Sequence, residues 1–356
     1  MNFFIHHKIY IYITFIVLII NLIQFSTNKA NSNIYKISNI SVSEPYDLNF
    51  DKSNVIDKAF NKAFLQLLKI TVHSENLKEV SNFKIKDVKK IIESFEIIEE
   101  NFKNNEYSSK FNVSFEKKKY LQYLEKKNIF SSIPKKKKIF FLPINVTTDD
   151  KKIALYSENF FYKNWNKEIK KFHLIEYILP NEDLEDLILL KKNLENLENY
   201  DFKEIINKYD ISDFIILITF ENDNSINTLT KININKEYVF MRKKYDFYKR
   251  DYLKVIKALK KDYEDEWKKI NMINTSIKLN IRLNIKSNQY ASIKKLEKKL
   301  YNIDLLSSFK IEKLSNEKIT YKIIYNGTPD KFLNDLKFNN LKVDRSGEIW
   351  EVIDNE

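Results

Sequence analysis

The 356-residue chain contains no cysteine. This absence excludes disulfide bonds, zinc sites built on thiolates, thiol catalysis and the lipid attachment of bacterial lipoproteins, which needs a cysteine at the processing site. A chain without cysteine is allowed in an oxidising compartment, but nothing in this composition demands one. The compartment must therefore be argued from other features of the sequence.

Glycine occurs only twice, as Gly327 and Gly347. Loops that hold phosphate groups need several glycines, because the backbone must approach the phosphate closely. Two isolated glycines cannot form a dinucleotide-binding motif or a P-loop, so we predict no nucleotide ligand and no cofactor. In a chain this poor in glycine, we expect both residues to hold turn positions with a positive backbone φ angle.

Arginine is also scarce, since only four of the 61 basic residues are arginine and the rest are lysine. The net charge of +12 can indicate a nucleic-acid partner or an anionic membrane. However, arginine is the usual residue for base contacts, and the abundance of Lys, Asn, Ile, Phe and Tyr fits the codon bias of an AT-rich genome. We therefore predict no nucleic-acid partner from the charge.

The sequence contains no recognisable catalytic or metal-binding motif. Of its four histidines, His6 and His7 precede the hydrophobic run near the amino terminus, and neither His73 nor His173 has a Cys, His or acidic residue at metal-ligand spacing. A role of His173 as a ligand or general base is considered, but edge packing or exposure explains this residue better. Two acidic groups, Asp149-Asp150 and Glu182-Asp183-Glu185-Asp186, have the chemistry for acid–base work, but a polar turn and a helix start explain them as well. We predict no catalytic, cofactor-binding or metal-binding residue, and a hydrolase that uses these carboxylates is the alternative.

A hydrophobic run from Ile9 to Ile23 follows a short lead that ends in Lys8. A basic lead before about 7–15 apolar residues is typical of an export signal, and the run is short for a bilayer span of about 20 residues. The best cleavage position follows Ala30, although it matches the preferred small residues only in part. We predict that residues 1–30 are either a cleaved signal peptide or a retained anchor. A retained anchor would tether the protein to the inner membrane through residues 9–25, and in both cases the rest of the chain lies in the periplasm.

Beyond this leader, the hydrophobic pattern divides the chain into three units. The first, residues 33–128, is predicted to have the order β-α-α-β-β-α. Its first helix carries apolar residues at i, i+3 and i+4 between Val55 and Leu68, and begins after Ser53, which is suited to an N-cap. Two strands around the turn at 103–106 indicate a hairpin, and a further helix closes the unit.

We interpret residues 131–138 as a solvated linker, because this polar join contains a proline and four consecutive lysines.

The second unit, residues 137–271, opens with a nearly continuous apolar run at 139–146, which is typical of a strand covered on both faces. Strands then alternate with helices, which indicates α/β layers. We expect helices at 157–171, 182–207 and 251–270, strands at 174–179 and 214–220, and a meander at 226–247.

The third unit, residues 276–353, begins with strict alternation of apolar and polar residues from Ile277 to Ile285. A helix, two strands, a second helix opened by Thr328-Pro329 and two short closing strands follow. This order, β-α-β-β-α-β, predicts a ferredoxin-like module. The predicted fold class is therefore α+β to α/β, with a leader helix before three small modules.

Five residues are predicted to matter for structure and not for chemistry. Each tryptophan lies among apolar neighbours, which favours core packing. The proline follows the first four residues of the apolar run, and both glycines lie at turns of the third unit. The five residues are Pro143, Trp165, Gly327, Gly347 and Trp350.

Several segments together carry a family likeness: the helix at 54–69 (NVIDKAFNKAFLQLLK), the strand pair at 94–97 and 107–115, the strand at 139–146 (IFFLPINV), Trp165, the helix start at Asp183 and Asp186, Tyr325-Asn326-Gly327, and Trp350. This pattern resembles a bacterial envelope family known only as a domain of unknown function. The second unit is similar in layout to the amino-terminal domain of TolB and to the curli-secretion and lipoprotein-activator domains, a likeness of fold alone. The resemblance implies export and supplies no catalytic residue.

These features together predict an exported, non-catalytic envelope protein whose modules bind other envelope proteins or machinery associated with the cell wall. The carboxylate-dependent hydrolase is one alternative. A nucleic-acid-binding protein is the other, although the strands at 305–314 and 318–325 lack the aromatic signature of an RNA-binding sheet.

Overall fold

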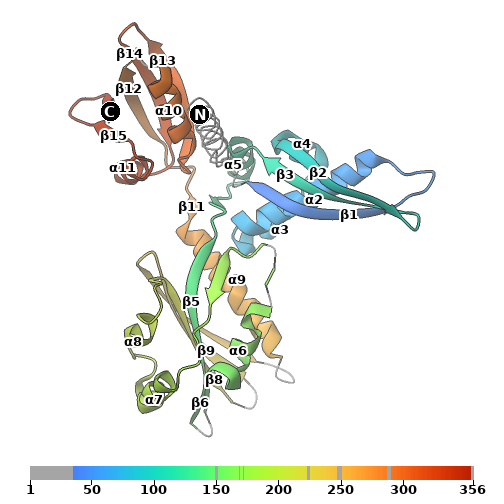
Figure 1. Ribbon diagram of the computed structural model, residues 1–356, viewed down its shortest axis with the longest axis vertical. Helices are drawn as coiled ribbons and strands as arrows, with labels where there is room; N and C mark the ends of the chain where they lie inside the picture. The colour runs from blue at the N-terminus through green and yellow to red at the C-terminus, as the bar shows by residue number, and fades with distance from the viewer. Residues whose placement is uncertain are drawn as a thin grey trace, which may run out of the picture.

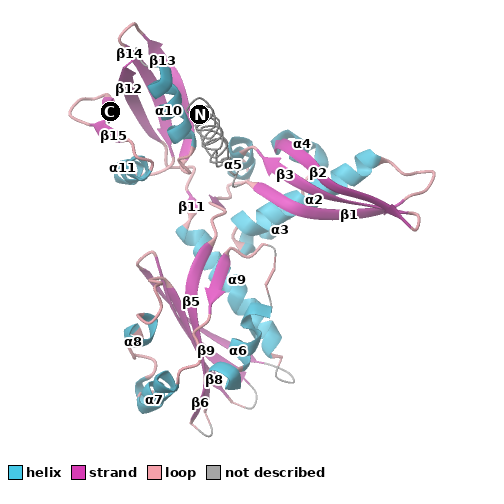
Figure 2. Ribbon diagram, in the orientation of Figure 1, coloured by secondary structure: helices cyan, strands magenta, loops and turns pink. Residues whose placement is uncertain are grey.

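The computed structural model describes residues 35–148, 151–167, 169–170, 172–222, 225–246, 251–286 and 290–353. These residues form a mixed α/β protein with three β-sheets and a central two-stranded ribbon (Figures 1 and 2). The mixed α and β class is therefore confirmed. The predicted leader lies outside the described residues. Among the helices that are described, none is both long enough and apolar enough to cross a bilayer.

The first module is a three-stranded antiparallel sheet in the order β1-β3-β2, with α2 along one face (Figure 1). The helix α2 begins after Asp51, whose side chain accepts a hydrogen bond from the Ser53 backbone N–H, so the N-cap is Asp51 and not Ser53 as predicted. The elements are β1 (Lys36–Pro45), α2 (Lys52–Thr71), η1 (Ser74–Asn76), α3 (Leu77–Ser81), α4 (Ile85–Ile91), β2 (Ile92–Lys103), β3 (Glu106–Phe115) and α5 (Lys117–Glu125).

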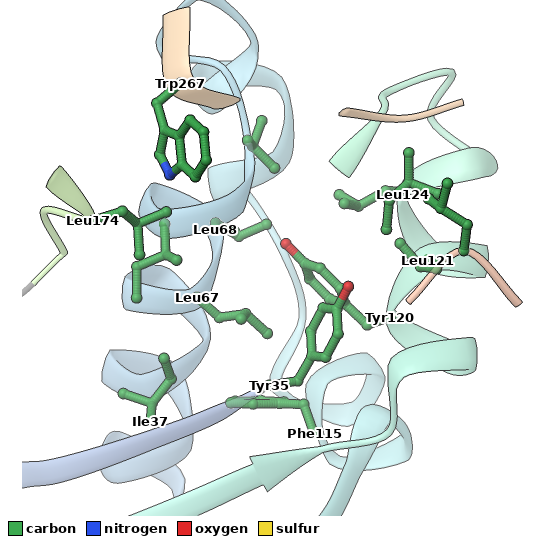
Figure 3. Close-up of a cluster of buried hydrophobic side chains, with 14 of the residues drawn as sticks. Tyr35, Ile37, Leu67, Leu68, Phe115, Tyr120, Leu121, Leu124, Leu174 and Trp267 are labelled. Carbon is green, nitrogen blue, oxygen red and sulfur yellow. The ribbon is translucent and has the colours of Figure 1, made fainter. Parts of the chain in front are cut away.

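The apolar face of α2 lies at the centre of a core that extends beyond the first module. Figure 3 shows Leu67 and Leu68 of α2 near Tyr120 of α5, with Leu174 and Trp267 of the second module drawn around the same helix. Buried residues of all three modules belong to one continuous apolar cluster. Because apolar burial is the main favourable term in folding, the modules are packed together and not merely connected.

The second module is a six-stranded sheet in which β5 pairs with β8 on one side and with β6 and β7 on the other. Alternate residues of β5 enter different cores: Ile139 and Phe141 pack on the α9 side, and Phe140 and Leu142 pack with residues of α7 and α8. The continuous apolar run is thus explained by a strand covered on both faces. The elements are β5 (Lys137–Thr147), β6 (Lys152–Ala154), η2 (Tyr156–Glu158), α6 (Phe160–Asn164), η3 (Trp165–Lys167), β7 (Ile175–Ile178), α7 (Leu184–Lys192), η4 (Leu194–Asn196), α8 (Lys203–Ile206), β8 (Phe214–Glu221), β9 (Ser225–Ile234), β10 (Glu237–Asp246) and α9 (Tyr252–Ile270).

Two predicted helices of this module are shorter than the sequence pattern indicated. The segment 157–171 contains η2, α6 and η3, and the segment 182–207 is divided into α7, η4 and α8. The side-chain amide of Asn193 donates to the Leu189 carbonyl at 2.8 Å, where α7 ends. Asparagine side chains compete in this way with helical hydrogen bonds, which explains why the long helix is interrupted.

The join predicted as a solvated linker is a packed junction. Ser131–Ser132 form β4, which pairs antiparallel with β11 (Met272–Ile273), and both serines are buried. Ser132 Oγ donates to the Thr71 carbonyl at 3.0 Å, and Trp267 Nε1 donates to the Lys135 carbonyl at 2.8 Å. The prediction was wrong because composition does not reveal which neighbours satisfy a polar segment's hydrogen bonds.

Pro143 lies inside β5, where a proline needs a position that uses no backbone N–H. On one edge, β5 pairs with β7 as far as Phe140 and with β6 only from Asn145 onward. Pro143 falls between these two partner strands, and its carbonyl accepts a hydrogen bond from Asn159 Nδ2 at 3.0 Å. The proline therefore marks the point where one edge of β5 changes partner.

The third module is a five-stranded sheet in the order β13-β14-β12-β16-β15. The Thr328 side chain caps α11 as predicted, by accepting a hydrogen bond from the Lys331 N–H. The closing hairpin differs from the expected ferredoxin-like arrangement, because β16 lies between β12 and β15 and runs parallel to β12. The elements are β12 (Leu279–Lys286), α10 (Tyr290–Tyr301), β13 (Leu306–Leu314), β14 (Lys318–Tyr325), α11 (Pro329–Phe338), β15 (Lys342–Asp344) and β16 (Trp350–Ile353).

Neither glycine has a positive φ angle, so that expectation was wrong. Most of the positive φ angles among the described residues belong to asparagine, which tolerates this conformation better than other residues with a side chain: Asn39, Asn104, Asn105, Asn128, Asn235 and Asn340. Gly327 has a packing reason instead, because a Cβ atom there would lie 2.6 Å from Cε1 of Tyr325. At Gly347 the nearest atom to a built Cβ is 3.6 Å away, which is an ordinary contact.

Candidate functional site: a cleft between the first and third modules

The predicted acidic residues at 182–186 are held in structural contacts. Asp183 caps α7 and pairs with Lys208 at 2.5 Å, and buried Asp186 lies 2.6 Å from the same ammonium. The hydrogen bond from Lys208 lowers the pKa of Asp183, and the two carboxylates raise the pKa of Lys208. Glu182 accepts the Ser157 backbone N–H at 3.2 Å. These charges hold α7 in place, and an ion-paired carboxylate is a poor general base.

The other predicted acidic pair, Asp149 and Asp150, lies outside the described residues. Within the described ranges, no group of three or more His, Asp or Glu side chains is placed to hold a metal ion. Of the candidate carboxylates that the structure describes, those at 182–186, none lines the cleft reported below.

The predicted tryptophans have different surroundings. Trp165 is fully buried and stacks on Phe141 with 4.0 Å between ring centroids. Trp350 is half-buried, with its ring 5.8 Å from that of Phe332. Both side chains pack against other aromatic rings, and this packing explains their positions.

A stripe of buried charged residues on α9 was missed by the sequence analysis. Lys260, Glu264 and Lys268 follow one another at intervals of four, and each is less than a tenth exposed. Glu264 accepts hydrogen bonds from the backbone N–H groups of Leu174 and Ile175 at 2.9 and 3.0 Å. Burial raises the pKa of Glu264, and these hydrogen bonds partly oppose that shift. The stripe thus holds the start of β7 against α9.

Lys268 of this stripe and the neighbouring Asp265 tie the second module to the first. Lys268 Nζ donates to the Val72 carbonyl at 3.1 Å, and Asp265 accepts the Ser74 backbone N–H at 3.0 Å. The spacing of four was visible in the sequence, but charged stripes on amphipathic helices normally face solvent. Only the packing of the first module and of the start of β7 against α9 reveals that this stripe is buried.

His173, which the sequence analysis considered as a ligand or base, lies in the loop before β7. Its Nδ1 accepts the Lys170 backbone N–H at 3.3 Å, which requires that nitrogen to carry no proton. Burial, together with the positive charges of Lys260, Lys170 and Lys268, lowers the pKa of His173 to about 4. The imidazole is therefore neutral in the folded protein at neutral pH.

This shift predicts acid sensitivity between pH 6.5 and about pH 4. In that window the unfolded chain binds a proton at His173 that the folded chain does not, so stability falls as the pH falls. In H173Q, we expect the thermal midpoint to fall less than that of the wild type between pH 7 and pH 4.5. The control is H73Q, and thermal scans by circular dichroism at several pH values make the measurement. Parallel pH profiles for wild type and H173Q would contradict this account.

The described residues enclose a cleft of about 790 Å³ between the first and third modules. One wall is α5, and the other is formed by the end of α10 and the start of β13. Two contacts cross between the modules: Lys117 Nζ donates to the Asp304 carbonyl, and Lys278 Nζ lies 3.3 Å from Glu125 Oε1. Burial lowers the pKa of Lys117, although the nearby Asp304 opposes this shift.

Two features of the cleft are characteristic of a binding surface. Asn326 lines it and is only 6% exposed, yet its Oδ1 has no hydrogen-bond partner among the described residues. A buried acceptor left without a partner costs about 1–3 kcal/mol. In addition, the pairing of β13 with β14 shifts at Ser307, which leaves a bulge in a strand at the edge of its sheet. We take this cleft as the candidate functional site.

No protein-family model matches the chain, and no curated protein matches it. One similar solved structure is described as an uncharacterized protein. It shares 9% sequence identity and covers 38% of this chain and 88% of its own, with a TM-score of 0.14.

The sequence analysis did not find this cleft. Its walls combine α5 with residues of α10 and β13 that lie more than a hundred positions later in the chain. The one partial signal is the Tyr325-Asn326-Gly327 segment, which the sequence analysis noted for a family likeness and not as a binding residue. A site assembled from separate modules leaves no local motif.

Proposed function

We propose that the protein is an exported component of the bacterial envelope that acts by binding other proteins and not by catalysis. The observation that carries this proposal is the cleft between the first and third modules, with its unpaired buried acceptor at Asn326. Pockets with a few convergent polar groups are the usual places for binding. The pairing of Asp183 and Asp186 with Lys208 leaves the hydrolase alternative without support from these residues.

The location follows from the leader and from the family likeness of the sequence. A signal peptide would release the modules into the periplasm, whereas a retained anchor would hold them at the inner membrane through residues 9–25. In this proposal the second module is a TolB-like layer and the third is a variant of the ferredoxin-like fold with an inserted strand. The partners are envelope proteins or machinery associated with the cell wall.

The test combines location and contact in living cells. A photo-crosslinking amino acid is placed at Gln122, which is exposed and lines the cleft, and at Lys261, which is exposed on α9, as the matched control. An epitope tag follows Glu356, and the mature amino terminus is sequenced. We expect the protein in the envelope fraction, with a discrete adduct to an envelope protein from position 122 and none from position 261. A cytosolic protein, or equal adducts at both positions, would refute the proposal.

A further inference from the structure

The wall of the cleft includes a strand that can accept a partner. β13 pairs with β14 on one side and ends the sheet on the other, among the described residues. Its first residues, from Leu306 to Phe309, line the cleft. An edge strand presents backbone N–H and C=O groups in a regular row, which is the template for addition of another strand. The free edge of the third module therefore begins inside the candidate site.

The polar groups around this strand match a peptide main chain. Asn326 Oδ1 is a buried acceptor without a partner, so it calls for an N–H donor. Lys117 has three N–H donors and is seen to use one acceptor, the Asp304 carbonyl, so it can also bind a carbonyl of a ligand. An extended peptide supplies both groups in alternation along its backbone.

The charges of the cleft argue for a partner without strong charge. Acidic and basic residues both line the cleft. They are Glu93, Glu116, Glu125, Asp304, Lys117, Lys118 and Lys278. Several of these are already matched, as in the pairs of Lys278 with Glu125 and of Lys119 with Glu116. A strongly anionic or cationic ligand would meet repulsion from one set, whereas neutral backbone amides meet none.

We propose that the cleft binds an extended, nearly neutral peptide segment of a partner protein, which adds as a strand to the edge of β13 and is recognised mainly through its main chain. This inference rests on the proposed function, because it specifies how the partner of the same cleft is held. It assigns Asn326 as a binding residue and Ser307 as the bulge that turns the start of β13 toward the peptide.

The first test uses peptides selected from a random peptide library against the purified full-length protein. Each backbone amide of the tightest peptide is replaced in turn by an ester, which removes one N–H donor and keeps the side chain. Strand addition predicts that every second ester weakens binding roughly tenfold, while the intervening esters have little effect. Losses that follow side chains and not backbone position, or a selection that yields no binding peptide, would overturn the proposal.

The second test uses N326L, which removes the unpaired acceptor and keeps the approximate volume. We expect roughly tenfold weaker peptide binding and a thermal midpoint that does not fall, because a buried group without a partner disappears. N199L, at an exposed asparagine of the second module, is the control. Unchanged affinity in N326L would overturn the role of Asn326. If the adduct from Gln122 still formed in that case, the proposed function would stand and only strand addition would fail.

Discussion

Replacing Trp165 with alanine should lower the free energy of unfolding by about 3–5 kcal/mol, the range for removing a large aromatic side chain from a core. The indole ring stacks on Phe141 at 4.0 Å, and the rings of Tyr177 and Tyr263 lie 5.4 and 5.9 Å from it. Lys260 Nζ also lies 5.3 Å from the indole ring. The variant therefore opens a cavity beside a buried charge, and we expect the thermal midpoint to fall by roughly 4–7 °C.

Two variants separate the contribution of burial from that of aromatic character. W350A removes a half-buried indole and should cost only about 1 kcal/mol. W165F keeps the stack on Phe141 and removes an indole N–H that has no hydrogen-bond partner among the described residues, so it should cost less than W165A. Thermal and urea unfolding followed by circular dichroism give the comparison. Equal losses in W165A and W350A would show that the buried stack is not important.

Replacing Asn159 with aspartate should destabilise the second module by at least about 3 kcal/mol. The side chain of Asn159 is fully buried, and its Nδ2 donates to the carbonyls of Pro143 at 3.0 Å and Ala154 at 3.3 Å. Its Oδ1 accepts the N–H groups of Phe161 and Tyr162 at 2.8 and 3.4 Å. A carboxylate keeps the second pair of contacts but places a negative oxygen against two carbonyls. One side chain thus joins β5, β6 and α6.

The loss in N159D should depend on pH. A carboxyl buried against carbonyls has a raised pKa in the folded state, because the neutral acid can donate one hydrogen bond. The destabilisation relative to wild type is therefore largest at neutral pH and shrinks as the pH falls through the folded pKa. N199D places the same charge on an exposed asparagine and should change stability by less than about 0.5 kcal/mol. Similar unfolding midpoints for N159D and N199D at pH 7 would rule out the role of Asn159.

Much of the secondary structure follows from local patterns. The alternation between Leu279 and Ile285 predicts β12, and the turn at 103–106 predicts the β2–β3 hairpin, which the structure contains. These signals are reliable because side-chain direction repeats every two residues in a strand. The continuous apolar run of β5 likewise predicts burial on both faces.

Other predictions failed where residue type alone had to decide a conformation. The glycines were expected at positive φ, yet asparagines such as Asn104 and Asn235 hold these turn positions. Ser131 and Ser132 were expected in solvent, yet both are buried in a two-stranded ribbon. A polar side chain can satisfy itself with water or with a neighbour, and local sequence does not distinguish these outcomes.

The amino-acid sequence alone is sufficient for the mixed α/β class, the order of most elements and the absence of cysteine chemistry and glycine-rich phosphate loops, because each depends on residue identity or on spacing along a few turns. The tertiary structure alone decides the burial of Lys260, Glu264 and Lys268, the environment of Asn159 and the cleft around Asn326. Each of these depends on which distant segment packs against a residue. For these polar and charged residues, burial and hydrogen-bond partners are set by that packing and are not predicted by the local sequence.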